Sequence, residues 1–430
     1  MRCHGRRTIL PTLLAVYCLL GPDVLAAQDA SYDEVVPESA ETDEGMFDVH
    51  RVGDQLLFEI PDDLLGREMI VMSRYHRVQE GQGAAGQRMA PNIVVRWEQR
   101  GDRVLLRAVS HATSAGAEDN VSIAVENQSF APILQSFEIE ARGDRSVVID
   151  VTDLYMGDTP TFSMPSNQRQ TLGVRSYDRD RSWLEWSKSF PINVEVRVVQ
   201  TYDSSQPPSN TRGGTLSFEV NHSMVLLPEE PMMPRLYDER VGFISLQVTN
   251  YSRDFDGVRP ERYAVRYRLE PSDPEAFLRG ELVDPVKPWI WYIDPATPVE
   301  WVPYIEAGIL EWNAGFEEAG FSNVMQVRQA PTEEEDPEFS LLDARYSVLR
   351  FAASPIRSAN SAKPPDLASA MMSSSSEAMR RGRTGPRSLV MASRSIRCSA
   401  TSFSGAGRVP AGRSGRWPDS CSLACSIWLE

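Results

Sequence analysis

The sequence pattern changes at residues 287–321, which read KPWIWYIDPATPVEWVPYIEAGILEWNAGFEEAGF. The run WIWYI lies between two prolines, which predicts a short buried strand. After it, apolar side chains recur every three or four residues, and this spacing predicts one long helix over residues 298–319 with a single buried stripe: Val302, Ile305, Ile309, Trp312 and Phe316. The stretch therefore predicts an α/β unit.

The ends of this helix also carry recognisable signals. Thr297 is a good N-cap, Pro298 suits the first helical position, and Glu300 completes a Thr-x-x-Glu capping box. Gly320 is a typical C-terminal stop. We therefore expect the helix to begin at residue 298 and to run without a break.

Two further strands are predicted after the helix. NVMQVRQ (323–329) and YSVLRFA (346–352) alternate like strands, and the acidic loop PTEEEDPEF (331–339) separates them. The order is β-α-β-β. Since a strand–helix–strand crossover is right-handed and places its two strands in parallel, we expect a parallel pair with the helix on one face.

Residues 45–271 show a different pattern, because short strand-like runs alternate with turn residues. Examples are QLLFEI, EMIVMSRYHRV, NIVVRWEQRGDRVLLRAVS, FPINVEVRVVQTY and GTLSFEVNHSMVLL. Such spacing predicts an antiparallel sandwich or a barrel-like domain. The acidic residues 28–44 have little pattern and are expected to be flexible, and residues 272–286 are expected to be a linker.

Five stretches resemble a family of exported bacterial zinc-dependent metalloproteases of the metzincin group. They are GMFDVHRVGDQLLFEIPDDLLGREMIVMSR, PRLYDERVGFI, RYRLEPSDP, PVKPWIWYIDPATPVEWVPYIEAGILEWNAGFEEAGF and DARYSVLRFAASPI, in this order between residues 45 and 356. The resemblance implies a large β-rich domain of unknown function at 45–271. It also implies that residues 287–356 are the opening part of an incomplete, metzincin-like α/β (β-α-β-β) protease domain, with 289–293 as its first strand.

The zinc site that this resemblance implies is missing from the sequence. In such enzymes a helix carries His-Glu-x-x-His, which supplies two zinc ligands and a general base. The five histidines here are His4, His50, His76, His111 and His222; no two lie one helical turn apart and none precedes Glu. We therefore name no catalytic, metal-binding or cofactor-binding residue, and we expect zinc in the full-length family but not in this chain.

The tail, residues 357–430, differs from the rest in charge and pattern. It contains 11 Lys+Arg and 4 Asp+Glu, whereas the other residues contain 33 and 56. One interpretation is a disordered basic tail that binds an anionic partner. The other, which we favour, is a reading-frame shift near residue 356 that replaced the metal helix and truncated the protease domain.

The first 27 residues predict an export signal. Basic residues precede an apolar run at 9–20, and Ala26 and Ala27 offer a cleavage site. The five cysteines, at 3, 18, 398, 421 and 425, leave the body without a disulfide. We expect a periplasmic or extracellular protein with no membrane anchor. Its acidic body, within a formal net charge of −16, argues against nucleic acid as a partner.

Two functional hypotheses follow. The first is the front part of an exported zinc metalloprotease, whose full-length relatives cut protein or peptide substrates, and which is inactive as written. The alternative is an exported, non-catalytic β-domain that binds a ligand or a protein partner.

Two weaker motifs have simpler explanations. GQGAAG (81–86) fits the dinucleotide pattern G-x-G-x-x-G, but a proline and a strand follow it instead of a helix, so we expect a loop. His76, His111 and His222 could converge on a metal ion from three strands, but isolated histidines are more often ordinary hydrogen-bonded residues.

Overall fold

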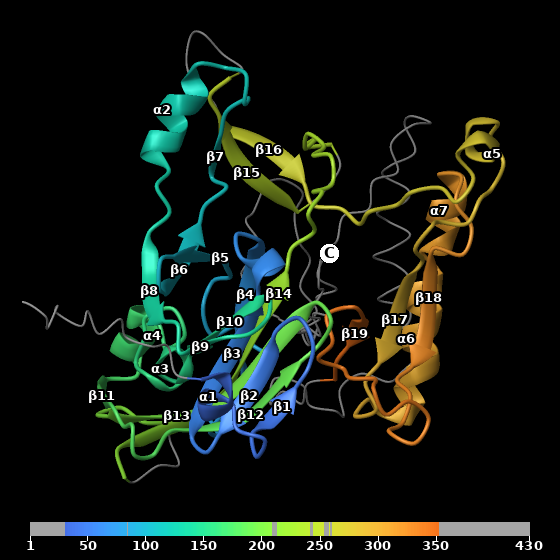
Figure 1. The fold of residues 1–430 in the computed structure, drawn as a ribbon. Coiled ribbons are helices and arrows are strands. Elements are labelled where there is room, and N and C mark those ends of the chain that lie inside the picture. The colour runs from blue at the N-terminus through green and yellow to red at the C-terminus, as the bar shows by residue number, and fades with distance from the viewer. Residues whose placement is uncertain are drawn as a thin grey trace, which may run out of the picture.

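The computed structural model describes residues 31–83, 85–208, 213–240, 244–252, 258 and 260–351. They form a β-rich region up to about residue 271 and a smaller α/β unit after it, which lie beside each other (Figure 1). The export signal expected at 1–27 and the tail at 357–430 lie outside the described residues. No helix in the described ranges is long and apolar enough to span a membrane.

The first layer of the β-rich region is an antiparallel sheet, called sheet A. Its strand order is β1-β2-β3-β10-β9. The strands are β1 (Glu41–Asp43), β2 (Asp48–Val52), β3 (Gln55–Pro61), β10 (Ser146–Asp150) and β9 (Ala141–Arg142). The helix α1 (Tyr32–Val35) precedes it. Residues 31–44, expected to be flexible, thus contain a helix and the edge strand β1, because Thr42 and its neighbours pair with β2.

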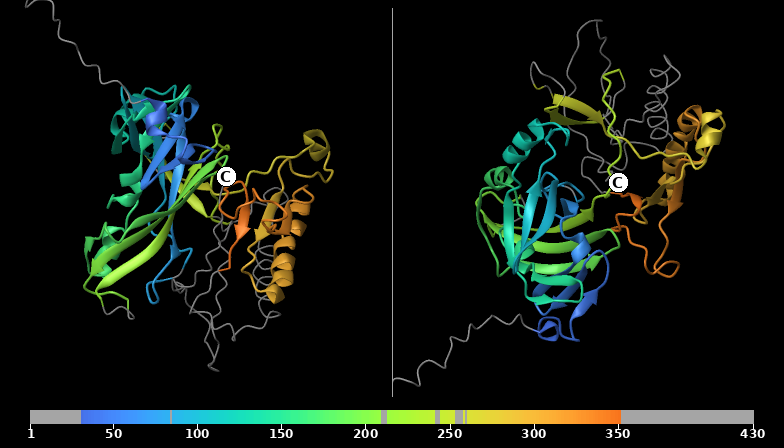
Figure 2. Two further views of the ribbon diagram at one scale, coloured as in Figure 1. Left: turned by 60° about the horizontal axis from the view of Figure 1, so that its bottom comes forward. Right: turned by 45° about the horizontal axis from the view of Figure 1, so that its top comes forward.

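The second layer is an eight-stranded antiparallel sheet, called sheet B, which curls into half a barrel (Figure 2). Its order is β11-β13-β14-β4-β5-β6-β8, and β12 also pairs with β13. The strands are β4 (Glu68–Arg77), β5 (Ile93–Arg100), β6 (Arg103–Val109), β8 (Ile133–Glu138), β11 (Val174–Tyr177), β12 (Trp183–Ser189), β13 (Asn193–Ser204) and β14 (Thr215–Leu226). The predicted antiparallel, β-rich architecture is confirmed.

One hydrophobic core fills the space between the two sheets. Phe58 of β3 meets Trp97 of β5 with ring centroids 6.5 Å apart, and both side chains are fully buried. The short helices η1 (Asp62–Leu64) and α3 (Thr152–Met156) follow β3 and β10, and α4 (Ser166–Thr171) lies between α3 and β11. Helix α3 buries Leu154, Tyr155 and Met156 in the core. This core explains why the period-two alternation in the sequence is so regular.

A third sheet projects from the end of sheet B together with helix α2 (Val121–Gln128) (Figure 1). Its strands β16 (Pro260–Ala264) and β15 (Ser245–Asn250) are antiparallel, and β15 is parallel to β7 (Thr113–Ser114). None of the residues of α2 is buried. This projection was not predicted as a separate element.

The α/β unit has a three-stranded parallel sheet, order β18-β17-β19. The strands are β17 (Trp289–Ile293), β18 (Met325–Gln329) and β19 (Ser347–Leu349). The predicted parallel crossover between β17 and β18 is confirmed. The residues at 272–286, expected to be a linker, contain helix α5 (Pro274–Leu278), and Ala276 and Val283 belong to the core of this unit.

The long helix predicted at 298–319 is divided into three parts: η2 (Val299–Trp301), α6 (Val302–Leu310) and α7 (Asn313–Glu318). At Trp312 the backbone N–H bonds to Ile309, three residues back, at 3.2 Å. The side chain of Asn313 then holds Met325 of β18 through both its backbone N–H (2.8 Å) and its carbonyl (2.9 Å). The helix breaks where this side chain attaches it to the sheet.

The predicted capping box at Thr297 is also wrong. Residues 299–301 begin as a 3-10 turn whose N-cap is Pro298, and no side chain caps it. The Thr297 hydroxyl is buried and has no hydrogen-bond partner among the described residues. Thr297 instead closes a backbone turn on Asp294 at 2.9 Å.

The connection from β18 to β19 contains no helix. It must pass β17, because β17 lies between the two strands, and it does so as an irregular segment at residues 330–346, which we call the crossover loop. Phe339 and Tyr346 of this loop pack against Tyr292 of β17, with ring centroids 5.0 and 5.3 Å from it. The crossover loop therefore covers the face of the sheet opposite α6.

Candidate functional site

The best candidate site lies where the crossover loop meets the outer face of sheet B. Along β13, Val194, Val196 and Val198 point into the core, so their neighbours Asn193, Glu195 and Arg197 point to the outer face. An outer face normally meets water, yet Asn193 and Glu195 are fully buried. Something therefore covers this part of the sheet.

The covering segment is the crossover loop, and Asn193 binds its backbone. Its side-chain amide donates to the Leu342 carbonyl at 2.9 Å, and its carbonyl oxygen accepts from the Ala344 N–H, also at 2.9 Å. Ala344 also joins a small apolar cluster with Met72 and Val225 of sheet B. The two units are thus joined by paired hydrogen bonds between residues about 150 positions apart in the chain.

Glu195 lies one step further along β13, at the centre of a buried polar cluster. Its carboxylate accepts from the Asn193 amide at 2.7 Å, from the Ser223 hydroxyl at 2.6 Å and from the Asn221 amide. Ser223 is its partner across the strands β13 and β14. Burial raises the pKa of Glu195 to about 7, against the lowering effect of these three donors and of the Arg350 charge.

Charged side chains surround this cluster. Glu219 lies 3.3 Å from Arg77, 3.4 Å from Arg197 and 3.8 Å from His76. The guanidinium of Arg197 also lies over the ring of Trp186, 4.9 Å from its centroid. Burial lowers the pKa of Arg197, and burial together with neighbouring arginines lowers the pKa of His76 to about 4.

The loop side of the cluster contributes Arg350, which follows β19. Its guanidinium donates to the Leu341 carbonyl at 2.8 Å, and burial lowers its pKa. On the loop itself, Arg345 forms a fork with the buried carboxylate of Asp343, with contacts between 2.7 and 3.1 Å. These contacts give the crossover loop one defined conformation against sheet B.

The described histidines lie apart from one another. His111 pairs with Glu68 at 2.7 Å on the surface, and His76 lies on the outer face of β4. His222 is buried in the core, where its Nδ1 lies 2.8 Å from the Ser73 hydroxyl and burial lowers its pKa to about 3. His50 is buried in sheet A and bonds to Thr42 and Glu59. The idea that three of them converge on a metal ion is wrong.

A second carboxylate with several hydrogen-bond partners, Glu59, is half-buried on sheet A. It accepts from the Tyr32 hydroxyl at 2.6 Å, from the Ser146 hydroxyl and from His50 at 3.1 Å. Since Tyr32 belongs to α1 and Ser146 to β10, the group attaches the first helix to sheet A. This arrangement stabilises the amino-terminal segment.

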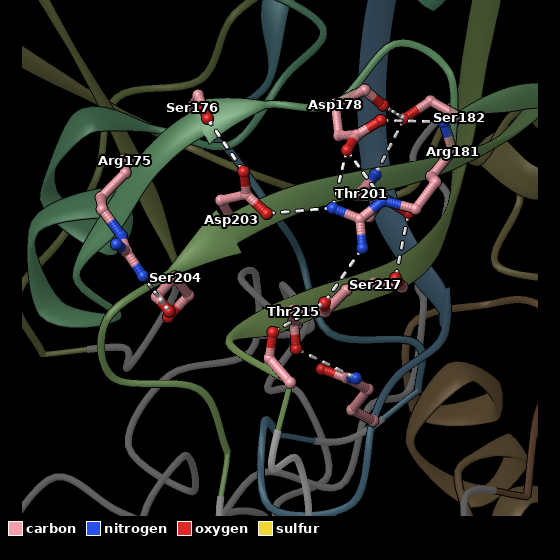
Figure 3. A network of polar contacts seen from close by, with 12 residues as sticks. Arg175, Ser176, Asp178, Arg181, Ser182, Thr201, Asp203, Ser204, Thr215 and Ser217 are labelled. Carbon is pink, nitrogen blue, oxygen red and sulfur yellow. Dashed lines mark hydrogen bonds and ion pairs between the residues drawn. The ribbon is translucent and has the colours of Figure 1, made fainter.

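The far end of β13 carries a third polar network (Figure 3). Arg181 donates to Asp178 at 2.8 Å, to Asp203 at 2.9 Å and to the Thr215 hydroxyl at 3.0 Å. The Thr201 and Ser217 hydroxyls lie 2.9 Å apart. These polar groups are hydrogen-bonded to one another at an exposed end of the sheet. The network therefore connects the turn after β11 to β13 and β14.

The described residues of the sequence motif GQGAAG, at 81–83, 85 and 86, lie in the loop after β4, as predicted. Strand β5 follows it, and the described residues at 81 and 83 have positive φ angles of 87° and 150°. No helix follows the loop to receive a pyrophosphate.

No group of three or more His, Cys, Asp or Glu in the described ranges could hold a metal ion. Neither Asn193 nor Glu195 was predicted from the sequence as a functional residue. The signal that could have found them is N-V-E-V-R-V at residues 193–198, in which polar residues alternate with valine on a strand that has neighbours on both sides.

Comparison with known proteins identifies two domain families. Residues 86–272 match a family described as a domain of unknown function, DUF5117, and residues 29–78 match another, DUF5118. Together they lie over the β-rich region. Neither the curated proteins nor the solved structures contain a match.

Proposed function

We propose that this chain is the front part of an exported zinc-dependent metalloprotease, in which the β-rich region is a non-catalytic scaffold that holds the opening strands of the catalytic domain. The observation that supports the scaffold role is a pair of hydrogen bonds: the Asn193 side-chain amide donates to the Leu342 carbonyl, and its carbonyl oxygen accepts from the Ala344 N–H. They attach the crossover loop, and with it β19, to sheet B.

The α/β unit supports the protease part of the proposal. The resemblance places the first strand of a protease domain at 289–293 and its backing helix at 298–319. In the structure β17 (Trp289–Ile293) is the central strand of a parallel sheet, and α6 packs beside β18. A parallel sheet with a helix on one face has the layered form that the proposal needs.

The described residues do not fit a catalytic zinc ion. They offer no group of three metal-binding side chains, and the whole sequence contains no His-Glu-x-x-His. We therefore derive no hydrolytic step for this chain, and propose that the 430-residue chain does not cut peptide bonds by itself.

Zinc analysis and a casein-digestion assay of the purified chain test this proposal. We expect neither stoichiometric zinc nor turnover above a buffer blank, with or without added zinc. Stoichiometric zinc together with turnover that a chelator stops would contradict it.

A second test uses the gene. If the DNA after the codon for Ile356 encodes His-Glu-x-x-His in another reading frame, the chain is a broken protease. If no frame encodes it, the alternative of an exported β-domain that binds a ligand or partner is favoured.

A further inference from the structure

We propose that the attachment of the crossover loop to sheet B is coupled to proton uptake by Glu195, so that the two units hold together more tightly in acid. This inference rests on the scaffold part of the proposed function and needs no protease activity. Its basis is the position of one carboxyl group on the outer face of a sheet, under a loop that belongs to the other unit.

The loop itself removes Glu195 from water. Asn193, which precedes Glu195 on the same face, binds the loop backbone, and Ala344 packs against Met72. Met72 is in register with Ser223, the cross-strand partner of Glu195. The loop therefore reaches the row of side chains that contains Glu195. When it leaves, this carboxyl becomes a surface group on an open sheet face.

Burial favours the protonated carboxyl, and it outweighs the opposing charge of Arg350, although Lys188 of β12 also lies opposite Glu195. The three donors to Glu195 are all neutral, namely two amides and a hydroxyl. A protonated Glu195 can still be satisfied, because its O–H can donate to the Ser223 hydroxyl oxygen, 2.6 Å away, so that the direction of this hydrogen bond reverses. The cluster can therefore hydrogen-bond to Glu195 in its protonated and in its ionised form, and burial favours the protonated form.

Other charged groups face the junction from each neighbouring element. They are Lys188 on β12, Arg197 on β13, Glu219 on β14, Arg74 and His76 on β4, and Asp294, Asp343, Arg345 and Arg350 from the α/β unit. His76, with its pKa lowered to about 4, stays neutral above pH 5. Burial also raises the pKa of Glu219, which is paired with Arg77 and Arg197, so Glu219 needs its own control.

The sign of the effect follows from the two pKa values of Glu195. Its pKa is about 7 in the docked state and about 4.5 as an ordinary carboxyl. Docking is therefore strongest below pH 4.5, weakens as the pH rises from 4.5 to 7, and changes little above pH 7.

Hydrogen exchange of the Ala344 amide measures docking directly, because this N–H bonds to Asn193. We would follow it by mass spectrometry in the full chain between pH 5 and 8, corrected for the intrinsic pH dependence of exchange. For the wild type we expect protection to fall on the order of 100-fold between pH 5 and 8. For Glu195→Gln, which cannot ionise, we expect protection that does not vary with pH.

Three variants serve as comparisons. Glu219→Gln on the same face and His111→Gln on the surface should keep the wild-type pH profile. Ser223→Ala removes one donor to the carboxylate, so it should move the midpoint to higher pH, and it keeps the test informative if Glu195→Gln does not fold. Equal pH dependence in the wild type and Glu195→Gln, an unmoved midpoint in Ser223→Ala, or a flattened profile in Glu219→Gln would overturn the proposal. A zinc or protease result changes none of these outcomes.

Discussion

The two faces of strands β13 and β14 are both buried, but different interactions stabilise the buried side chains on each face. On the inner face, Val194, Val196 and Val198 are fully buried against the aromatic core. On the outer face, Asn193 and Glu195 are as deeply buried, but they are satisfied by hydrogen bonds. Apolar burial is non-directional, whereas each buried polar group needs a partner of defined geometry. The inner face therefore supplies stability, and the outer face selects which segment may dock.

The largest expected effect tests the inner face. Trp97 is fully buried between Phe58 and Phe137, whose ring centroids lie 6.5 and 5.5 Å away. Trp97→Ala should lower the free energy of unfolding by about 3–5 kcal/mol, because it removes this contact area and leaves a cavity. Urea unfolding measures the change. As a control, Trp183→Ala at a half-exposed site should cost less than about 1 kcal/mol; equal losses would refute the contrast.

The next effect tests the outer face. Asn193→Ala leaves the buried Ala344 N–H and the Leu342 carbonyl without their partner, which should weaken docking by about 2 kcal/mol. Hydrogen exchange at Ala344 should speed up by about 30-fold, while the core strands keep their protection. The exposed Asn127→Ala is the matched control. If the core strands lose protection equally, the outer face would not be a separate docking surface.

A third prediction contrasts the response of the two faces to acid. Burial lowers the pKa of His222 on the inner face to about 3, so the folded protein resists its protonation. Acidification from pH 7 to 5.5 charges the unfolded histidine and should cost about 1 kcal/mol of stability. Glu195 acts in the opposite direction over the same range.

The variant His222→Gln removes the stability loss that comes from protonation of His222 in the unfolded chain. Compared with the wild type, it should lose about 1 kcal/mol less between pH 7 and 5.5, as measured by urea unfolding at both values. His111→Gln, at an exposed site, is the control and should leave the difference unchanged. An identical loss in the wild type and His222→Gln would show that protonation of His222 does not affect stability between pH 7 and 5.5.

The smallest effect concerns the rim of the outer face. Trp186 lies under the Arg197 guanidinium at 4.9 Å. Trp186→Leu keeps an apolar side chain but removes the cation–π contact, so the free energy of unfolding should fall by about 0.5 kcal/mol. Trp183→Leu on the same strand is the comparison. A loss above about 2 kcal/mol would mean that the rim contributes as much as the docking contacts.

The sequence predicted the strands better than it predicted what covers them. The period-two pattern of NVEVRVV correctly indicates a strand with valines on one face, and the run WIWYI correctly indicates β17. Local alternation also suggests that Glu195 meets water. It cannot show otherwise, because the residues that cover Glu195 follow about 150 positions later and carry no local mark of their partner.

Two incorrect predictions, the unbroken helix and the flexible acidic segment, also failed because contacts between distant parts of the chain determine the structure there. The helix at 298–319 has an apolar stripe throughout, but the Asn313 side chain bonds to Met325 and divides it, which is a tertiary contact that helical periodicity does not show. The acidic residues near Glu41 were expected to be flexible because of their composition. Pairing of β1 with β2 and the bond from Tyr32 to Glu59 hold them in place.

The helix-free crossover has a consequence for how this protein can be divided. The loop at 330–346 contacts Tyr292 in one unit and Met72 and Val225 in the other, so it buries apolar side chains of both units. A cut near residue 271 would leave an apolar strip bare on the amino-terminal piece. It would also leave the carboxy-terminal piece with a loop that has lost half of its packing. Each fragment would expose apolar residues that are buried in the whole chain. The point at which the sequence pattern changes is therefore not a point at which the folded protein can be divided into two stable pieces.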